Sequence, residues 1–165
     1  MKLLIIRHAI AVDRGVSGVS DDERPLTPDG EKKFRQAARG LADAAPRPAV
    51  LFTSPLLRAR QTAEIAAAAW GRLKARDLPA LASGDMDGLA AALAEQPQDA
   101  TIAVVGHEPH VSDLLARLLG GAAAERLTFR KGGAALVELP GGLAEGGRLV
   151  WYLRPRILRR LGKAG

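Results

Sequence analysis

Short aliphatic runs alternate with helical repeats along this chain. The runs at residues 2–6, 49–53 and 101–105 are mainly apolar, as is typical of strands buried on both faces of a parallel sheet. Two later runs, 133–139 and 148–154, are joined by the glycine-rich stretch "PGGLAEGG" and are expected to form a closing pair of strands. The alternation of strands and helices predicts a three-layer α/β/α sandwich with a mostly parallel central sheet and an antiparallel edge.

The first helix is predicted by its capping residues as well as by its apolar spacing. Residues 13–26 mix Gly, Ser and Asp without periodicity, so they are expected to form a loop. Thr27 and Pro28 then suit the N-cap and the first helical position. The apolar side chains that follow at helical spacing are Phe34, Ala37, Ala38 and Leu41.

A second helix is predicted to begin at Ser54 and Pro55, which have the same N-cap and first-position character. Further helices are expected at 89–96 and 110–121, where leucine and alanine predominate. The intervening residues 72–88 have a weaker pattern that could hold an edge strand.

Length and composition favour a single domain without disulfides. The 165 residues suffice for one hydrophobic core, and no repeat or linker divides residues 1–165. The sequence contains no cysteine, which excludes a disulfide framework and a thiolate zinc site. The apolar run after Lys2 is too short for a secretory signal, and no run reaches the roughly 18 residues that a membrane span needs. We therefore expect a soluble, cytoplasmic protein that has no membrane partner.

The charge of the chain favours partners that carry phosphate. The formal net charge is +6, and guanidinium groups match phosphate oxygens bidentately. Part of the excess lies in residues 154–165, which we interpret as a basic C-terminal tail exposed to solvent. Aromatic residues, which could stack on bases, make up only 4% of the chain, so nucleic acid is not expected as a partner.

Basic side chains follow three of the predicted strands. Arg7 and His8 come directly after the first strand, Arg58 falls in the first turn of the second helix, and His107 follows the strand at 101–105. Alone, each has an ordinary explanation as a solvated arginine or a hydrogen-bonded histidine. The carboxyl ends of parallel strands meet at one edge of a sheet, however, where such cations would repel one another unless an anion lay between them. A phosphate-sized dianion fits this requirement.

Four segments closely resemble, in order and spacing, the histidine phosphatase superfamily, which has the phosphoglycerate mutase-like fold: "IIRHAIA", "RPLTPDGEKKFRQAA", "FTSPLLRARQTAEIA" and "VVGHEPHVSDLLARLL". The short chain, and "RPLTPDG" soon after the RH motif, resemble the SixA-type phosphohistidine phosphatases more specifically. The resemblance implies that His8 is the nucleophile. It also implies that the phosphoryl group is bound by Arg7, Arg24, Arg58 and His107.

One position departs from the family pattern. The family usually has glycine after the RH motif, and this chain has Ala9. Because alanine is the smallest replacement, we expect a slight narrowing near the nucleophile, with activity retained.

A neutral imidazole at His8 could attack phosphorus and form a covalent phosphohistidine, which water would then hydrolyse. Its second ring nitrogen would have to donate a hydrogen bond to a fixed acceptor, such as a backbone carbonyl. Arg7, Arg58 and a protonated His107 could stabilise the equatorial phosphoryl oxygens in the transition state. This mechanism requires no metal ion or other cofactor.

The sequence offers three candidates for a general acid that protonates the leaving group: Asp85, Asp87 and Glu108. Turn formation beside glycine explains the first two equally well, and a favourable charge at a helix N-terminus explains the third. A phosphohistidine substrate needs less help from an acid, because imidazole leaves more readily than an alkoxide.

The sequence therefore indicates a metal-independent phosphatase whose partner is a phosphorylated protein carrying phosphohistidine. Two alternatives are kept. One is a phosphatase of a small phosphomonoester, such as a sugar or nucleotide phosphate, with the same mechanism. The other is a non-catalytic module that binds phosphate or polyphosphate.

Overall fold

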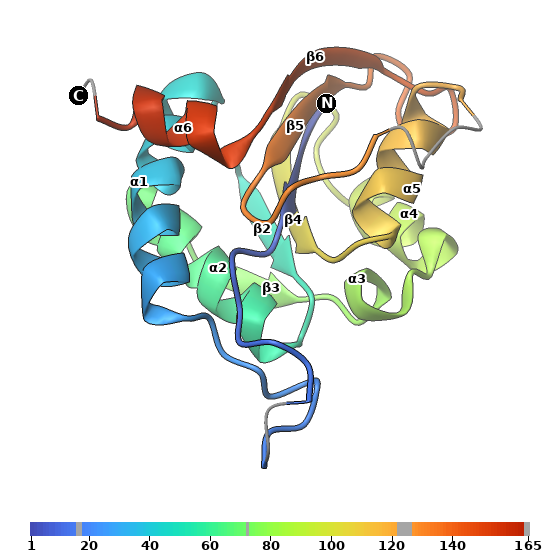
Figure 1. Ribbon diagram of the computed structural model, residues 1–165. Coiled ribbons are helices and arrows are strands. Elements are labelled where there is room, and N and C mark those ends of the chain that lie inside the picture. Colours follow the sequence, from blue (N-terminus) through green and yellow to red (C-terminus); the bar gives the residue numbers. More distant parts are fainter. Residues whose placement is uncertain (16–17, 72, 122–126, 164–165) are drawn as a thin grey trace.

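The centre of the protein is a six-stranded mixed sheet, seen in a computed structural model that describes residues 1–15, 18–71, 73–121 and 127–163 (Figure 1). The order of strands across the sheet is β3-β2-β4-β1-β5-β6. The strands are β1 (Lys2–Arg7), β2 (Val50–Thr53), β3 (Ala75–Asp77), β4 (Thr101–Gly106), β5 (Ala134–Glu138) and β6 (Arg148–Leu153).

The strand directions confirm the predicted sheet. Strand β1 is parallel to β4, and β2 is parallel to both β4 and β3. Strands β5 and β6 complete the sheet as an antiparallel edge beside β1. The weak pattern at 72–88 does contain a short edge strand, β3. The carboxyl ends of β1, β2 and β4 therefore meet at one edge.

Helices cover both faces of the sheet. They are α1 (Pro28–Ala44), α2 (Leu57–Ala69), α3 (Ala80–Ser83), α4 (Met86–Ala94), α5 (His110–Leu118) and α6 (Pro155–Leu161). Figure 1 shows α1, α2 and α6 on one face and α3, α4 and α5 on the other. None of these helices is long and apolar enough to cross a membrane, within the described residues.

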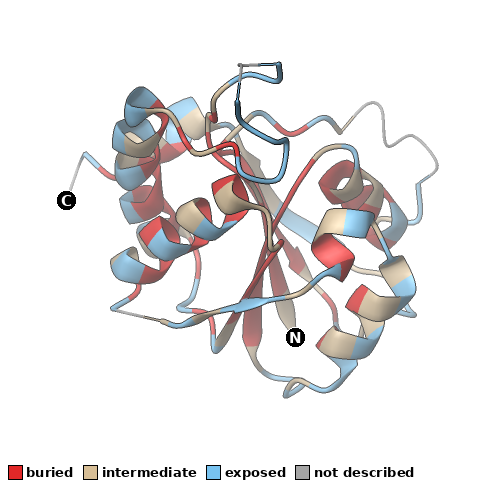
Figure 2. Cartoon of the chain, turned by 90° about the horizontal axis from the view of Figure 1, so that it is seen from below, coloured by how far each residue is buried: buried red, intermediate tan, exposed pale blue. Residues whose placement is uncertain are grey.

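The side chains of β1 alternate between two cores. Leu4 and Ile6 pack in the cluster under α1 and α2, whereas Leu3 and Ile5 pack in the cluster under α4 and α5. Figure 2 shows the resulting layers, with buried strands in the middle and exposed residues on the outer sides of the helices. The three-layer α/β/α sandwich is confirmed.

Helix α1 begins as its sequence predicts. The Thr27 side chain accepts a hydrogen bond from the Gly30 amide at 2.9 Å, and Pro28 occupies the first turn. All four predicted core residues of this helix are buried: Phe34, Ala37, Ala38 and Leu41. A Cβ at Gly30 would lie 2.1 Å from the Ile10 carbonyl oxygen, so glycine allows α1 to approach the segment that follows β1.

The predicted start of α2 was wrong. The helix begins at Leu57 with Leu56 in the N-cap position, and Ser54 is not its cap. The Ser54 amide still donates to the Val105 carbonyl at 2.9 Å, which keeps this residue in the sheet. Arg58 nevertheless lies in the first helical turn, as expected.

Residues 154–163 do not form the exposed tail that composition suggested for 154–165. Residues Pro155–Leu161 form α6, which packs against α1 and buries Leu158 completely. The two helices touch through glycine, because a Cβ at Gly40 would lie 2.0 Å from the Leu158 carbonyl oxygen. The basic residues of this segment are therefore held on a fixed surface, while 164–165 lie outside the described residues.

Candidate active site

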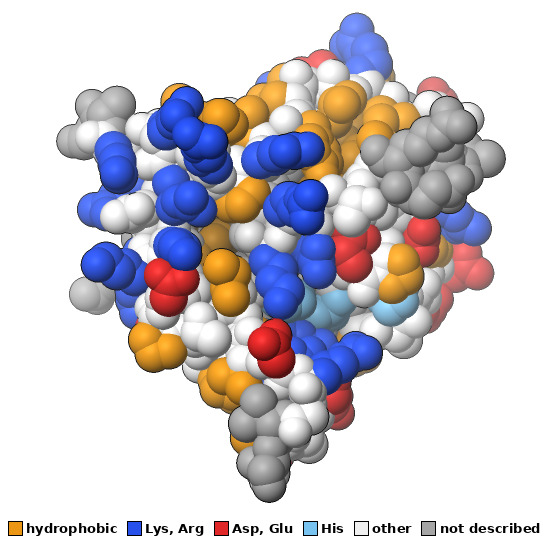
Figure 3. Space-filling model, viewed as in Figure 1, with side chains coloured by type: hydrophobic (Ala, Val, Ile, Leu, Met, Phe, Trp, Pro, Cys, Tyr) orange, Lys and Arg blue, Asp and Glu red, His pale blue; other side chains and the backbone are white. Residues whose placement is uncertain are grey.

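The predicted phosphate-binding residues come together at the carboxyl edge of the sheet. Arg7, at the end of β1, pairs with Gly106 of β4, and the His8 amide donates to the Gly106 carbonyl at 3.0 Å. This register places the His8 and His107 rings 5.0 Å apart, centroid to centroid. The side chains of Arg24 and Arg58 both hydrogen-bond to Asp21. Figure 3 shows histidine side chains in a hollow of this face, flanked by Lys and Arg.

The His8 ring is oriented by its own backbone. Its Nδ1 lies 2.7 Å from the Ala9 carbonyl oxygen, which can only accept a hydrogen bond, so Nδ1 carries the proton and Nε2 is left unprotonated. Burial lowers the pKa of His8 to about 3, and the neighbouring His107, Arg58 and Arg7 act in the same direction. The ring is therefore neutral at pH 7, as a nucleophile must be.

The Ala9 methyl group lies in the core. It is buried in the cluster that includes Phe34 and Ala37, and it lines a shallow hollow with these residues. The Ala9 amide donates to the Thr62 hydroxyl at 3.0 Å. The position of the methyl group thus gives no support to the expected narrowing beside the nucleophile, and the effect on activity stays a prediction.

Asp21, which the sequence analysis did not single out, joins the arginines of the site. Arg58 Nη1 donates to the Asp21 carbonyl at 2.6 Å, and its Nη2 lies 3.3 Å from Asp21 Oδ2. Arg24 and Arg14 both donate through Nε to Asp21 Oδ1, each at 2.9 Å. Burial alone would raise the pKa of Asp21, but the three guanidinium groups outweigh it and hold this pKa below its usual value.

Arg7 is held by a different set of groups. Its Nη1 donates to the Phe129 carbonyl oxygen, and the Phe129 amide in turn donates to Glu108 Oε1. The same carboxylate oxygen accepts from the Ser112 hydroxyl at 2.8 Å. Burial lowers the pKa of Arg7, and the charge of Glu108 opposes that shift. Glu108 is thus engaged in holding the backbone beside Arg7, which weighs against its use as a general acid.

Several buried nitrogen atoms of the site have no hydrogen-bond partner among the described residues. They are Arg7 Nε, Arg58 Nε and His107 Nδ1. Buried polar groups are almost always hydrogen-bonded, so unpartnered nitrogens in a cationic hollow indicate a place for an anionic ligand. An oxyanion with several acceptor oxygens fits these groups.

His107 differs from the sequence expectation in its charge. Its Nε2 lies 2.7 Å from Ser54 Oγ, the hydroxyl that was expected to cap α2. Burial lowers the pKa of His107 to about 4, with Arg58, His110 and Arg7 acting in the same direction against Asp21. With the protein groups alone His107 is therefore neutral at pH 7. The expected protonated form requires a bound dianion, which would raise this pKa.

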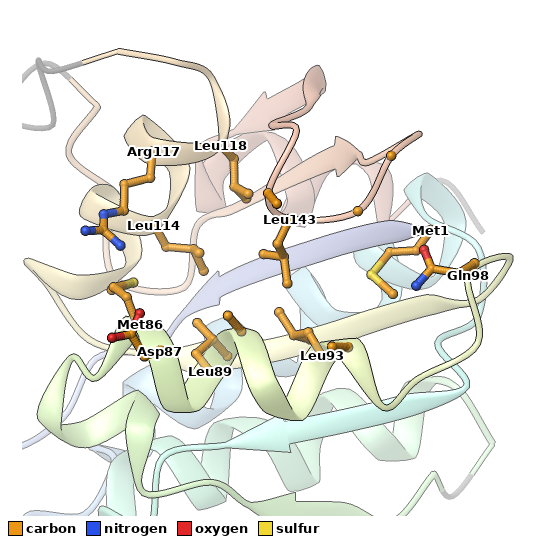
Figure 4. Close-up of a pocket in the computed structure, with 15 residues that line it drawn as sticks. Met1, Met86, Asp87, Leu89, Leu93, Gln98, Leu114, Arg117, Leu118 and Leu143 are labelled. Atoms are coloured by element: carbon orange, nitrogen blue, oxygen red, sulfur yellow. The ribbon is translucent and has the colours of Figure 1, made fainter.

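The other two acid candidates lie on α4 and serve other purposes. Asp85 caps this helix, accepting from the Gly88 amide at 3.0 Å. Asp87 is exposed and lines a groove of about 480 Å³ between α4 and α5, at the end where Arg117 lies (Figure 4). The apolar walls of this groove include Leu89, Leu93, Leu114, Leu118 and Leu143. In the described part of the chain, neither carboxylate hydrogen-bonds or ion-pairs with an arginine of the site.

The described residues contain no group of three or more His, Cys, Asp or Glu side chains arranged to hold a metal ion. The groups at this edge of the sheet are guanidinium, imidazole and hydroxyl groups, with the carboxylates of Asp21 and Glu108 held by protein donors. This set of groups can bind an oxyanion beside a neutral imidazole.

Comparison with known proteins agrees with this arrangement. Residues 3–97 match the model of the histidine phosphatase superfamily (branch 1). An uncharacterized protein of Picosynechococcus sp. is 35% identical over 147 residues, which are 87% of each chain.

Two solved structures are similar in both fold and sequence. The protein histidine phosphatase SixA complexed with tungstate is 28% identical with a TM-score of 0.76, over 96% of this chain and 99% of that one. The structure described as a putative SixA of Nakamurella multipartitia is 32% identical with a TM-score of 0.74, over 93% of this chain and 95% of that one. The mixed sheet and its covering helices are thus those of the phosphoglycerate mutase-like fold.

Proposed function

Because the chain belongs to branch 1 of the histidine phosphatase superfamily, we propose that it hydrolyses phosphohistidine on a partner protein through a covalent intermediate on His8. The observation that carries this proposal is the His8 imidazole, which is neutral, anchored through Nδ1 and surrounded by cationic groups. Membership of the superfamily is the basis for the phosphatase activity. The phosphohistidine substrate is our own inference.

In the first step, His8 Nε2 attacks phosphorus while the bond between phosphorus and the substrate nitrogen breaks. The departing imidazole takes a proton from solvent water and leaves as a neutral group, and the phosphoryl group is now bonded to Nε2. Arg7, Arg58 and His107 donate to the equatorial oxygens, where negative charge spreads in the transition state. Water then attacks phosphorus from the opposite side, the bond to Nε2 breaks, and phosphate and neutral His8 are regenerated.

Two features support phosphohistidine as the substrate. Two of the three candidate general acids are engaged elsewhere, Glu108 with the Phe129 amide and Asp85 with its helix end, and Asp87 lines the separate groove between α4 and α5. A phosphoramidate needs less protonation assistance than a phosphomonoester, so it is the substrate class that this set of groups handles best. The likeness to a structure described as the protein histidine phosphatase SixA points in the same direction.

A phosphoenzyme assay tests the chemistry. Brief incubation with a labelled phosphoramidate, followed by alkaline denaturation, should leave acid-labile, base-stable label on the wild-type protein and none on His8→Ala. His110→Gln is the matched control, because in the proposed mechanism His110 neither attacks phosphorus nor donates to a phosphoryl oxygen, and it should retain the label.

The substrate class is tested by kcat/KM, comparing phosphohistidine peptides with a panel of small phosphomonoesters. Higher values for a sugar or nucleotide phosphate would establish the phosphomonoester alternative. Tight phosphate binding without any phosphoenzyme or turnover would establish a non-catalytic module and overturn the proposal.

A further inference from the structure

Basic side chains gather beside the backbone segments that adjoin His8 and along α6; the Gly132 amide, next to Lys131, donates to the His8 carbonyl at 3.0 Å. A first hollow is lined by Ala9 and Ile10, the residues that follow His8, together with Lys33, Lys131 and Arg159. A second hollow, of about 270 Å³, is lined by four basic residues: Arg156, Arg159, Arg160 and Lys163. Arg159 lines both hollows, so the two groups of basic residues are neighbours. We call these six basic residues the α6 basic surface, and Figure 3 shows Lys and Arg gathered over α1 and α6.

The charge of the α6 basic surface is largely unneutralised. Only Lys33 forms an ion pair with a described residue, Asp29, at 2.6 Å. Basic residues elsewhere are often paired, as Arg60 is with Asp77 and Arg148 is with Glu138. Because the packing of α6 rests on buried Leu158, the fold does not require its arginines. Unpaired like charges repel one another, so their gathering beside the active site favours an acidic partner.

We propose that the α6 basic surface docks an acidic face of the phosphorylated protein while its phosphohistidine enters the site at His8. This inference rests on the proposed function for the identity of the partner. A protein whose phosphoryl group reaches His8 must place its neighbouring surface over the rim of the site, and on the side of Ala9 and Ile10 that rim is basic. The α6 basic surface would then select among phosphoproteins that present the same chemical group.

Other features of this face favour a protein over a nucleic acid or a membrane. None of the aromatic side chains among the described residues is fully exposed, so the face offers no platform for base stacking. Ile157 and Leu161 are 39% and 40% exposed and lie one helical turn apart on α6, beside its arginines. Arginine is among the residues enriched at protein interfaces, and these two side chains add apolar area beside it. A helix that lies in a membrane presents a long apolar face, whereas α6 has seven residues and already buries Leu158 against α1.

The kinetic test uses phosphohistidine peptides that differ only in their flanking residues, with Glu, Ser or Lys on both sides. We expect the wild-type kcat/KM to be highest for the Glu-flanked peptide and to fall with added salt. The double variant Arg156→Glu/Arg160→Glu should lower kcat/KM for that peptide about tenfold, through KM, and leave turnover of free phosphoramidate unchanged. The matched control is Lys74→Glu/Arg76→Glu, at the β3 edge of the sheet, which should behave as wild type on both substrates.

A binding test separates this inference from the proposed function. An unphosphorylated Glu-rich peptide should bind the wild type and the control but bind the α6 variant at least about tenfold more weakly. If the wild type binds this peptide through α6 yet hydrolyses no phosphohistidine, the proposed function fails and the docking surface stands. If all three flanked peptides are hydrolysed equally, by the variant as by the wild type, docking is overturned and the proposed function stands.

Two further probes decide between classes of partner. An RNA oligonucleotide of matched charge and vesicles containing phosphatidylglycerol are titrated under the same conditions. Tighter binding of either probe than of the Glu-rich peptide, lost in the α6 variant, would overturn the inference in favour of nucleic acid or membrane.

Discussion

Two cationic regions adjoin each other in this protein, and they are built differently. In the buried region, Arg7, Arg24 and Arg58 each donate to a fixed oxygen, which belongs to a carbonyl group or to Asp21. In the exposed region, five of the six residues of the α6 basic surface have no acidic partner among the described residues. Fixed partners determine where a charge lies, which matters for stabilising a transition state. Unpaired exposed charges act at longer range and matter for capturing a partner.

The largest expected effects come from the buried region. Arg58→Ala and His107→Ala should each lower kcat/KM by about a hundredfold or more, because each removes a donor to the phosphoryl oxygens. Arg58→Lys should restore little of the loss, since an ammonium group cannot reproduce the geometry of guanidinium. Steady-state kinetics on a phosphohistidine peptide measure kcat/KM for the three variants and the wild type.

Arg60→Ala is the control for Arg58, because Arg60 lies on the same helix and pairs with Asp77 at the surface. It should retain wild-type activity. Near-wild-type activity in either Arg58→Ala or His107→Ala would contradict the role assigned to that residue.

A smaller effect is expected from the carboxylate that the arginines share. Asp21→Asn keeps the backbone carbonyl that accepts from Arg58 but removes the negative charge between three guanidinium groups. We expect kcat to fall about tenfold, because the guanidinium groups then repel one another and lose their alignment. Asp22→Asn is the matched control, and an equal loss in both variants would show that the effect belongs to the loop and not to the shared charge.

Acid should destabilise the buried region within a defined pH range. The folded pKa values of His8 and His107 are lowered to about 3 and about 4 from an ordinary value of 6.5. Between these values the unfolded chain binds protons that the folded protein does not, so the free energy of unfolding falls as pH falls below 6.5. Each histidine should contribute up to about 2 kcal/mol of this loss at about pH 5.

Urea unfolding across this pH range measures the loss. His8→Gln and His107→Gln should each reduce the dependence on pH, because glutamine does not titrate. If the free energy of unfolding falls with pH as steeply in both variants as in the wild type, the acid sensitivity arises from other groups.

The smallest effects should come from substitutions of exposed charges, and they concern stability. The α6 double variant Arg156→Glu/Arg160→Glu should have a melting temperature close to that of the wild type, because single exposed charges contribute little to stability. A large loss of stability would mean that these arginines support the packing of α6 on α1.

Treatment with EDTA is expected to leave turnover unchanged, since the proposed steps use only side chains of the chain. Loss of activity that a divalent ion restores would overturn the metal-independent mechanism.

The sequence could predict the residues whose positions follow from the sheet. Arg7 ends β1, while His8 and His107 come directly after β1 and β4, and the parallel pairing of these strands makes their ends level. Any chain that alternates buried strands and helices brings such positions to one edge, so the convergence is readable from the pattern.

The groups that hold those residues were harder to predict from the sequence. Asp21 lies in an aperiodic loop with other acidic residues, and nothing local distinguishes it from its neighbours. The Ser54 hydroxyl could equally cap a helix or contact an imidazole, and only the fold decides between them. Helix α6 is short, and its formation depends on the close approach to Gly40 of α1, a contact far away in the sequence.

The hydrogen bond from His8 to its neighbour's carbonyl has a consequence for how such proteins diversify. Because the partner of Nδ1 is the adjacent residue of the same strand end, the nucleophile carries its own means of orientation. Loops and surface helices around it can change without disturbing which nitrogen attacks. Evolution, or a protein engineer, could therefore exchange the surface that selects the partner while leaving the reacting atom as it is.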